Sequence, residues 1–197
     1  YLPLSLLQFS RGCTNRCEYC AVTEYFGHRH FARPVAEVVH EIESQGLRDL
    51  FFVDDNLVAD HEAAKELFRA LVPLKIRWVS QVSLDHVNDP ELLDLMVECG
   101  CLGNVIGFES LDAECLRQMH KAPNLRSADA YATEVAELRR RHLQTWAALV
   151  LGYDHDTVDS LRAMCDWAIG NRFTFAAFNV LMPYPNTPLY ARLAEEG

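Results

Sequence analysis

The chain lacks two features that would place it in a membrane or on nucleic acid. None of its 197 residues lie in an apolar run that approaches the roughly 20 residues of a transmembrane helix. Positive charge is also scarce, because 18 Lys and Arg stand against 28 Asp and Glu, a net charge of −10. A broad nucleic-acid-binding surface needs the opposite sign. These absences predict no transmembrane segment and no broad nucleic-acid surface.

The sequence also lacks low-complexity segments, and no internal repeat stands out beyond an alternation of apolar patterns. With 50% hydrophobic and 23% charged residues, its composition is that of an ordinary globular protein. A chain of this length suits one domain with a sizeable core, so we expect a single domain over residues 1–197. The chain begins almost at its first strand pattern and stops inside a helical pattern, which favours a fragment of a longer protein.

Six short apolar segments have the composition of buried strands. They are Leu4–Phe9, Leu50–Val53, Trp78–Val82, Asn104–Phe108, Thr145–Leu151 and Phe175–Leu181. Helical patterns follow them, beginning at Pro34, Asp60, Asp89-Pro90, Asp112, Ser127 and Val158. Near-continuous apolar strands that alternate with helices predict an α/β fold with a parallel sheet covered by helices. Periodicity alone leaves a barrel, complete or partial, and an open doubly wound sheet as alternatives.

Three of the seven cysteines carry the strongest chemical signal. Cys13, Cys17 and Cys20 have a C-x3-C-x2-C spacing directly after the first apolar segment. A cubane iron–sulfur cluster has four irons, and a complete protein cage uses four thiolates. Three thiolates on one tight loop leave one iron free to bind another molecule. We therefore predict a 4Fe–4S cluster with an open iron, held by these three cysteines, as a catalytic site.

Two other interpretations of this loop remain open. A zinc site would need a fourth ligand, which His28 or His30 could supply. The segment 25–33 that contains both histidines is otherwise a solvated loop, or binds an anionic group of a ligand. A non-catalytic iron–sulfur protein for electron transfer or sensing would need a fourth thiolate, for which Cys99 and Cys101 are candidates.

The remaining cysteines argue against a disulfide framework. The total of seven is odd, and three belong to the loop motif. The four outside the loop are expected to be small buried hydrophobic residues. This usage predicts a reducing compartment, the cytoplasm.

The loop, written C-x3-C-x-aromatic-C with Tyr19 as the aromatic residue, resembles the signature of the radical S-adenosylmethionine (SAM) superfamily. The resemblance implies a partial (β/α)6 TIM-like barrel of parallel strands. It also implies that the methionine moiety of SAM chelates the open iron. An electron from the cluster, supplied by a reductant such as flavodoxin or ferredoxin, then cleaves SAM to methionine and a 5′-deoxyadenosyl radical. Tyr19 would pack against SAM or the cluster.

Polar and small residues follow the predicted strands. Functional side chains of parallel α/β folds gather beyond the carboxyl ends of the strands. The resemblance implies that SAM contacts come from these positions, namely Asp54, Asp55, Gln81, Ser83, Gly107, Glu109, Ser110, Gly152 and Met182. Capping of the next helix is the alternative for Asp54, Asp55 and Glu109. Plain core packing is the alternative for Met182.

Further segments resemble one subgroup of the superfamily. Residues 52–56 read Phe-Val-Asp-Asp-Asn, residues 107–110 read Gly-Phe-Glu-Ser, and residues 183–188 read Pro-Tyr-Pro-Asn-Thr-Pro. These resemble proteins with an N-terminal cobalamin-binding domain, whose relatives include the hopanoid methylases. The resemblance implies methyl transfer or rearrangement of a small-molecule substrate, such as a lipid or natural-product intermediate. It also implies cobalamin held by a domain that would precede residue 1.

Overall fold

A six-stranded parallel sheet organises the chain. The computed structural model describes residues 4–121, 124–125 and 128–196. The strands of the sheet are β1 (Ser5–Leu7), β4 (Asp49–Phe52), β5 (Arg77–Val82), β6 (Cys101–Glu109), β7 (Gln144–Leu151) and β8 (Phe175–Val180). They pair in this order, every pair is parallel, and β1 and β8 form the two edges. The sheet is therefore a partial barrel, which confirms the predicted fold class.

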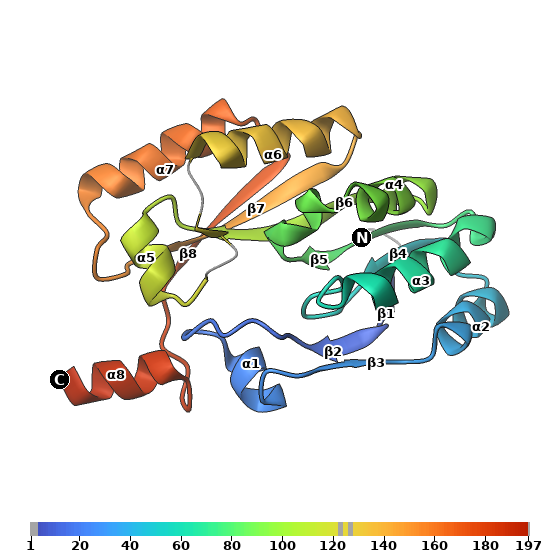
Figure 1. Cartoon of the computed structure of the whole chain (residues 1–197), viewed down its shortest axis with the longest axis horizontal. Coiled ribbons are helices and arrows are strands. Elements are labelled where there is room, and N and C mark those ends of the chain that lie inside the picture. The colour runs from blue at the N-terminus through green and yellow to red at the C-terminus, as the bar shows by residue number, and fades with distance from the viewer. Residues whose placement is uncertain (1–3, 122–123, 126–127, 197) are drawn as a thin grey trace.

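The helices form an arc along the outer side of the sheet (Figure 1). They are α2 (Val35–Gln45), α3 (His61–Leu71), α4 (Pro90–Glu98), α6 (Ala128–Arg140) and α7 (Val158–Gly170). Outside this arc, α5 (Ala113–Gln118), through its C-terminal cap Met119, and α8 (Pro188–Glu196) each make a backbone hydrogen bond with Glu18, between the second and third cysteines of the motif. Three predicted helix starts are confirmed, because Asp60, Asp89 and Asp112 accept hydrogen bonds from backbone N–H groups of the first turn. The predicted start at Ser127 lies outside the described residues. None of the described helices has the length and apolar character that crossing a membrane requires.

The core lies between the helices and the outer face of the sheet. Along β4 and β5, buried residues alternate with more exposed ones, as the period of two in a strand requires. Trp78 is fully buried and packs edge-on against Phe52 and close to Phe68 of α3. A buried aromatic side chain removes roughly 150–250 Å² from water, which stabilises the fold by about 4–6 kcal/mol. These contacts hold the sheet on which the functional residues stand.

The inner, concave face of the sheet is apolar at the amino ends of its strands. A groove of about 370 Å³ runs across this face. It is lined by large apolar side chains that include Leu4, Phe51, Val79, Leu102, Trp146 and Phe175. Several of them are exposed, among them Trp146 and Phe175.

Two local elements differ from the sequence-based expectation. The first predicted strand is shorter, and Ser10–Gly12 instead forms β2, which pairs antiparallel with β3 (His30–Ala32). Directly after the three cysteines, Ala21–Phe26 forms a short helix, α1, which ends at Gly27 in the left-handed conformation and overlaps the start of the segment 25–33 that was expected to be a loop. Both elements are too short for their periodicity to be recognised. Together they enclose the cysteine loop.

Candidate cluster-binding site

The three cysteines of the motif line one cavity of about 280 Å³ at the carboxyl ends of the strands. The cysteine loop connects β2 to α1 and covers the edge where β4, β5 and β6 end (Figure 1). Six of the residues predicted to bind SAM line the same cavity, namely Tyr19, Asp55, Gln81, Ser83, Gly107 and Glu109. The fold therefore gathers these candidates around the cysteines.

Two adjacent aspartates hold the beginning of the cysteine loop. Asp54 is fully buried, and its carboxylate accepts hydrogen bonds from the backbone N–H of Phe9 at 3.1 Å and from both the N–H and the hydroxyl of Ser10. Burial raises the pKa of Asp54, and these hydrogen bonds oppose that rise. The carboxylate of Asp55 accepts the N–H of Gly12 at 2.8 Å. Asp54 thus lies behind the cavity as a support, and Asp55 lies on its wall.

Gly12 permits the tight turn before Cys13. Its φ is +84°, a conformation that favours glycine, and a Cβ at this position would lie 2.1 Å from the carbonyl oxygen of Arg29. The backbone of Arg29, the residue before β3, therefore lies too close to Gly12 for a side chain at this position.

A buried ion pair faces the cysteines. The Lys121 ammonium lies 3.0 Å from the Glu109 carboxylate, and both side chains are 9% exposed. Glu109 has a φ of +66° at an irregularity in the pairing of β6 with β7. Backbone strain of this kind is concentrated at functional sites. Burial lowers the pKa of Lys121, but the charge of Glu109 and the nearby cysteines raise it above its usual value, so the side chain stays charged.

Gly107 and Tyr19 complete the surroundings of Glu109. A Cβ at Gly107 would lie 2.1 Å from Oε1 of Glu109, so only glycine leaves room for this carboxylate. Burial raises the pKa of Tyr19 well above its usual range, and the charge of Glu109 adds to the effect. The phenol is therefore neutral and can donate a hydrogen bond.

A second polar pair, Asn56 and Ser83, also lines the cavity. The Nδ2 group of Asn56 donates to Oγ of Ser83 at 3.0 Å and lies 3.8 Å from Sγ of Cys13. Oδ1 of Asn56 accepts the backbone N–H of Ser83 at 3.1 Å.

Four predicted SAM contacts, Asp54 and three others, are not among the residues that line the cavity. Ser110 is buried and its hydroxyl accepts the N–H of Asp112 at 3.0 Å. The N–H of Gly152 donates to Asp156 at 2.8 Å. Met182 is 61% exposed. Their roles toward SAM, like that of Asp54, remain predictions.

The residues of the alternative interpretations also lie away from the cavity wall. Cys101 begins β6 and Glu109 ends it, a separation of roughly 26 Å along an extended strand. The thiols of Cys99 and Cys101 donate to the carbonyl oxygens of Met96 and Gly103, and burial raises the pKa of Cys99 to about 12. Both are buried structural cysteines, as expected, and Cys115 is buried too. Cys165 is exposed, so the expectation that it is buried was wrong. Neither His28 nor His30 is among the residues that line the cavity.

Several residues that line the cavity were not predicted from the sequence, and two of them make the polar contacts described above, Asn56 and Lys121. Asn56 stands in the Asp-Asp-Asn run, so its position after a strand was a signal that could have identified it. Lys121 follows α5 with no motif around it, and nothing local indicates that it reaches Glu109.

The residues present fit a cubane cluster. Its three protein-bound irons each take a different thiolate, so the cysteines need to line one cavity without converging on a single point. Within the described ranges, no three His, Cys, Asp or Glu side chains are grouped to hold a single metal ion. Burial raises the pKa of Cys17 to about 11, and the charge of Lys121 counteracts this. Cysteines bind iron as thiolates, and the positive charge of Lys121 in this cavity favours that form.

A partial parallel barrel with a three-cysteine loop over the carboxyl ends of its strands defines a class of iron–sulfur catalytic core. The family model of the Radical SAM superfamily matches residues 7–168. The chain belongs to this superfamily.

Several similar proteins are named as methyltransferases. The chain is 27% identical over 201 residues to bacteriochlorophyllide d C-12(1)-methyltransferase of Chlorobaculum tepidum, with 99% of this chain and 44% of that protein covered. It is 26% identical to hopanoid C-2 methylase of Rhodopseudomonas palustris, with 98% and 38% covered. The chain thus spans less than half the length of these curated relatives.

The fold is shared with a solved methyltransferase. The radical SAM methyltransferase TsrM of Kitasatospora setae, solved with cobalamin and a [4Fe-4S] cluster bound, matches with a TM-score of 0.84 and 23% identity. The match covers 98% of this chain and 39% of that one.

Proposed function

We propose that this chain is the catalytic core of a radical SAM methyltransferase. Cys13, Cys17 and Cys20 would hold a 4Fe–4S cluster whose fourth iron binds SAM. The observation that carries the proposal is that these cysteines share one cavity with a buried ion pair and a row of polar side chains. When bound, the cluster supplies the electron that cleaves SAM reductively to a 5′-deoxyadenosyl radical.

The polar side chains of the cavity would hold SAM beside the cluster. Tyr19, Asp55, Gln81 and Glu109 offer donors and acceptors, and Gly107 leaves space for a close approach. Ser83 also lines the cavity and contributes a hydroxyl. Asp54 would support the site indirectly, by holding the cysteine loop in place. Ser110, Gly152 and Met182 do not line the cavity, so their contacts with SAM would lie outside it. The protein's part is placement and exclusion of water, because the radical chemistry belongs to the cofactors.

Methyl transfer would involve cobalamin bound by a region outside this chain. The support is the resemblance to hopanoid C-2 methylase and to TsrM, whose structure contains cobalamin. The substrate would be a small molecule such as a lipid or natural-product intermediate. The reductant would be a flavodoxin or ferredoxin, and the compartment the cytoplasm.

Electron paramagnetic resonance (EPR) of the anaerobically reconstituted, dithionite-reduced protein tests this function. We expect a reduced 4Fe–4S signal that shifts when SAM is added. Cys17→Ala should abolish cluster-dependent SAM cleavage, whereas Cys165→Ala, a change at an exposed cysteine outside the loop, should not. A signal indifferent to SAM would favour the electron-transfer alternative, and SAM cleavage retained in Cys17→Ala would contradict the proposal.

A further inference from the structure

The orientation of the Asn56 side chain is fixed by its neighbour. The backbone N–H of Ser83 can only donate, so the atom of Asn56 that it meets at 3.1 Å must be the carbonyl oxygen. The NH2 group therefore points the other way. One of its two hydrogens goes to Oγ of Ser83 at 3.0 Å, and the other faces Sγ of Cys13 at 3.8 Å.

The loop that carries Asn56 is itself held firmly. The N–H of Leu57 donates to the carbonyl of Gln81 at 3.0 Å, and the N–H of Ala59 donates to the carbonyl of Asn56 at 3.1 Å. Asn56 is 5% exposed and Cys13 is 9% exposed. A fixed donor in dry surroundings interacts more strongly with a sulfur than a solvated donor does.

We propose that Asn56 sets the reduction potential of the cluster by donating an N–H···S hydrogen bond to Cys13. This inference rests on the proposed function, because it requires the cluster to be bound by Cys13. Asn56 is a positioning residue in this role, since it acts through the sulfur and need not touch SAM. Ser83 orients it by occupying its oxygen and its second hydrogen.

The direction of the effect follows from charge. Reduction adds an electron to the cluster and makes its sulfurs more negative, so a donor to one of them stabilises the reduced state more than the oxidised state. Hydrogen bonds to the sulfurs are among the factors that set the potentials of such clusters. Loss of the donor should therefore make the cluster harder to reduce.

Redox titration of the reconstituted protein without SAM, followed by EPR, tests the inference. Asn56→Asp keeps an oxygen for the N–H of Ser83 but has no donor, and it adds a charge. Asn56→Leu removes the donor without adding a charge. We expect both variants to bind the cluster and to lower its midpoint potential, by an amount equal to about a tenfold fall in the equilibrium constant for reduction, or about 59 mV for one electron.

Asn104→Leu is the matched control. Asn104 is equally buried and also lies beside a cysteine sulfur, because the thiol of Cys101 donates to its Oδ1 at 3.7 Å. This cysteine is remote from the cavity. The control should leave the midpoint potential unchanged. Circular dichroism of each variant before reconstitution verifies that it has folded.

The possible outcomes separate the two proposals. Wild-type protein that forms no 4Fe–4S signal overturns the proposed function and this inference with it. A normal wild-type signal, with unchanged potentials in both Asn56 variants, overturns this inference alone. So does a drop in Asn56→Asp that is absent in Asn56→Leu, because the cause would then be the added charge.

Discussion

At the scale of single residues, two adjacent aspartates have different structural roles. Asp54 and Asp55 are adjacent, yet the first supports the backbone at Ser10 and the second reaches the cavity wall. Both follow the end of β4 at Phe52, and the chain bends at Asp55, so the two side chains meet different backbone groups. Two identical residues in sequence therefore have different roles, which depend on their surroundings in the folded protein.

Asp54→Asn should lower the free energy of unfolding by about 2 kcal/mol, because charge-assisted hydrogen bonds are worth about 1.5–3 kcal/mol. The amide offers a single oxygen to three donors that Asp54 now satisfies. Urea denaturation measures this loss. Asp159→Asn is the matched control, since that carboxylate is 93% exposed and should contribute nothing measurable.

Gly107→Ala should impair SAM binding while leaving the cluster in place. The new methyl group would overlap Oε1 of Glu109, which would have to leave Lys121. We expect a normal EPR signal of the reduced cluster and a weaker response to SAM. Gly170→Ala, at a position where an added Cβ would meet open space, should behave as the wild-type protein. An undiminished SAM response in Gly107→Ala would argue against a role for Glu109.

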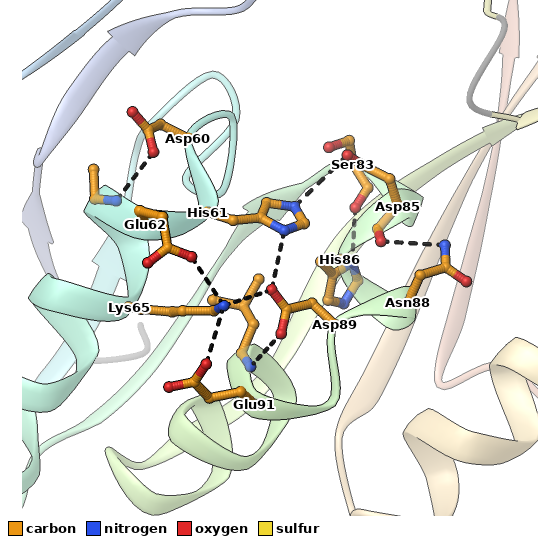
Figure 2. Close-up of polar contacts among 12 residues, drawn as sticks. Asp60, His61, Glu62, Lys65, Ser83, Asp85, His86, Asn88, Asp89 and Glu91 are labelled. Atoms are coloured by element: carbon orange, nitrogen blue, oxygen red, sulfur yellow. Dashed lines mark hydrogen bonds and ion pairs between the residues drawn. The ribbon is translucent and has the colours of Figure 1, made fainter.

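At the scale of elements, a polar network joins α3 to α4 through the 3-10 turn Leu84–Asn88 that follows β5 (Figure 2). The ammonium of Lys65 lies 2.8 Å from Asp89 and about as close to Glu62 and Glu91. His61 lies 3.4 Å from the same Asp89 carboxylate. Asp89 thus caps α4 and ties it to α3, so one side chain serves two elements.

His86, in the same turn, makes stability depend on pH. Burial lowers its pKa to about 4, although its bond to the carbonyl of Ser83 and the charge of Asp85 oppose this. Since the unfolded state binds the proton more readily, stability falls as pH drops from about 6.5 to 4. We expect a loss of roughly 2 kcal/mol at pH 5 relative to pH 7 from this residue.

Urea denaturation at both pH values checks this expectation. His86→Gln retains a donor for Ser83 but cannot titrate, so its stability should vary less with pH. His155→Gln, at an exposed position, should keep the wild-type dependence. Equal pH dependence in His86→Gln and the wild-type protein would refute the assignment.

Most elements could be predicted because their signals are local. The six strands are continuous apolar runs, and three helices begin with an aspartate that caps its own first turn. The hairpin of β2 and β3 and the helix α1 could not be predicted. Each is too short to show a period, and the hairpin pairs residues 10–12 with residues 30–32 across the cysteine loop.

At the scale of the whole molecule, the cysteine loop is a meeting point of distant segments. The N–H of Glu18 donates to the carbonyl of Met119, and the carbonyl of Glu18 accepts the N–H of Leu189. The ring of Tyr19 contacts that of Tyr153 edge-on at 6.4 Å. The loop thus joins the end of α5, the start of α8 and the turn after β7.

Cluster binding should therefore stabilise the whole fold. A group that binds only the native state raises its stability, and the gain grows with the logarithm of the ligand concentration divided by the dissociation constant. We expect anaerobic thermal denaturation, followed by circular dichroism, to give a higher Tm for reconstituted protein than for the metal-free form. Cys17→Ala should lose this difference and Cys165→Ala should keep it. An identical Tm in both wild-type forms would contradict the expectation.

The sequence by itself determined the spacing of the three-cysteine motif, the number of parallel strands and most helix starts. Each of these depends on residues that are close in the chain, so spacing and periodicity are enough. Only the tertiary structure decided that Asp54 supports the loop, that Lys121 pairs with Glu109 and that Asn56 faces Cys13. These contacts join residues 12 to 45 positions apart. Such pairings depend on how β4, β5 and β6 align side by side, which no local pattern encodes.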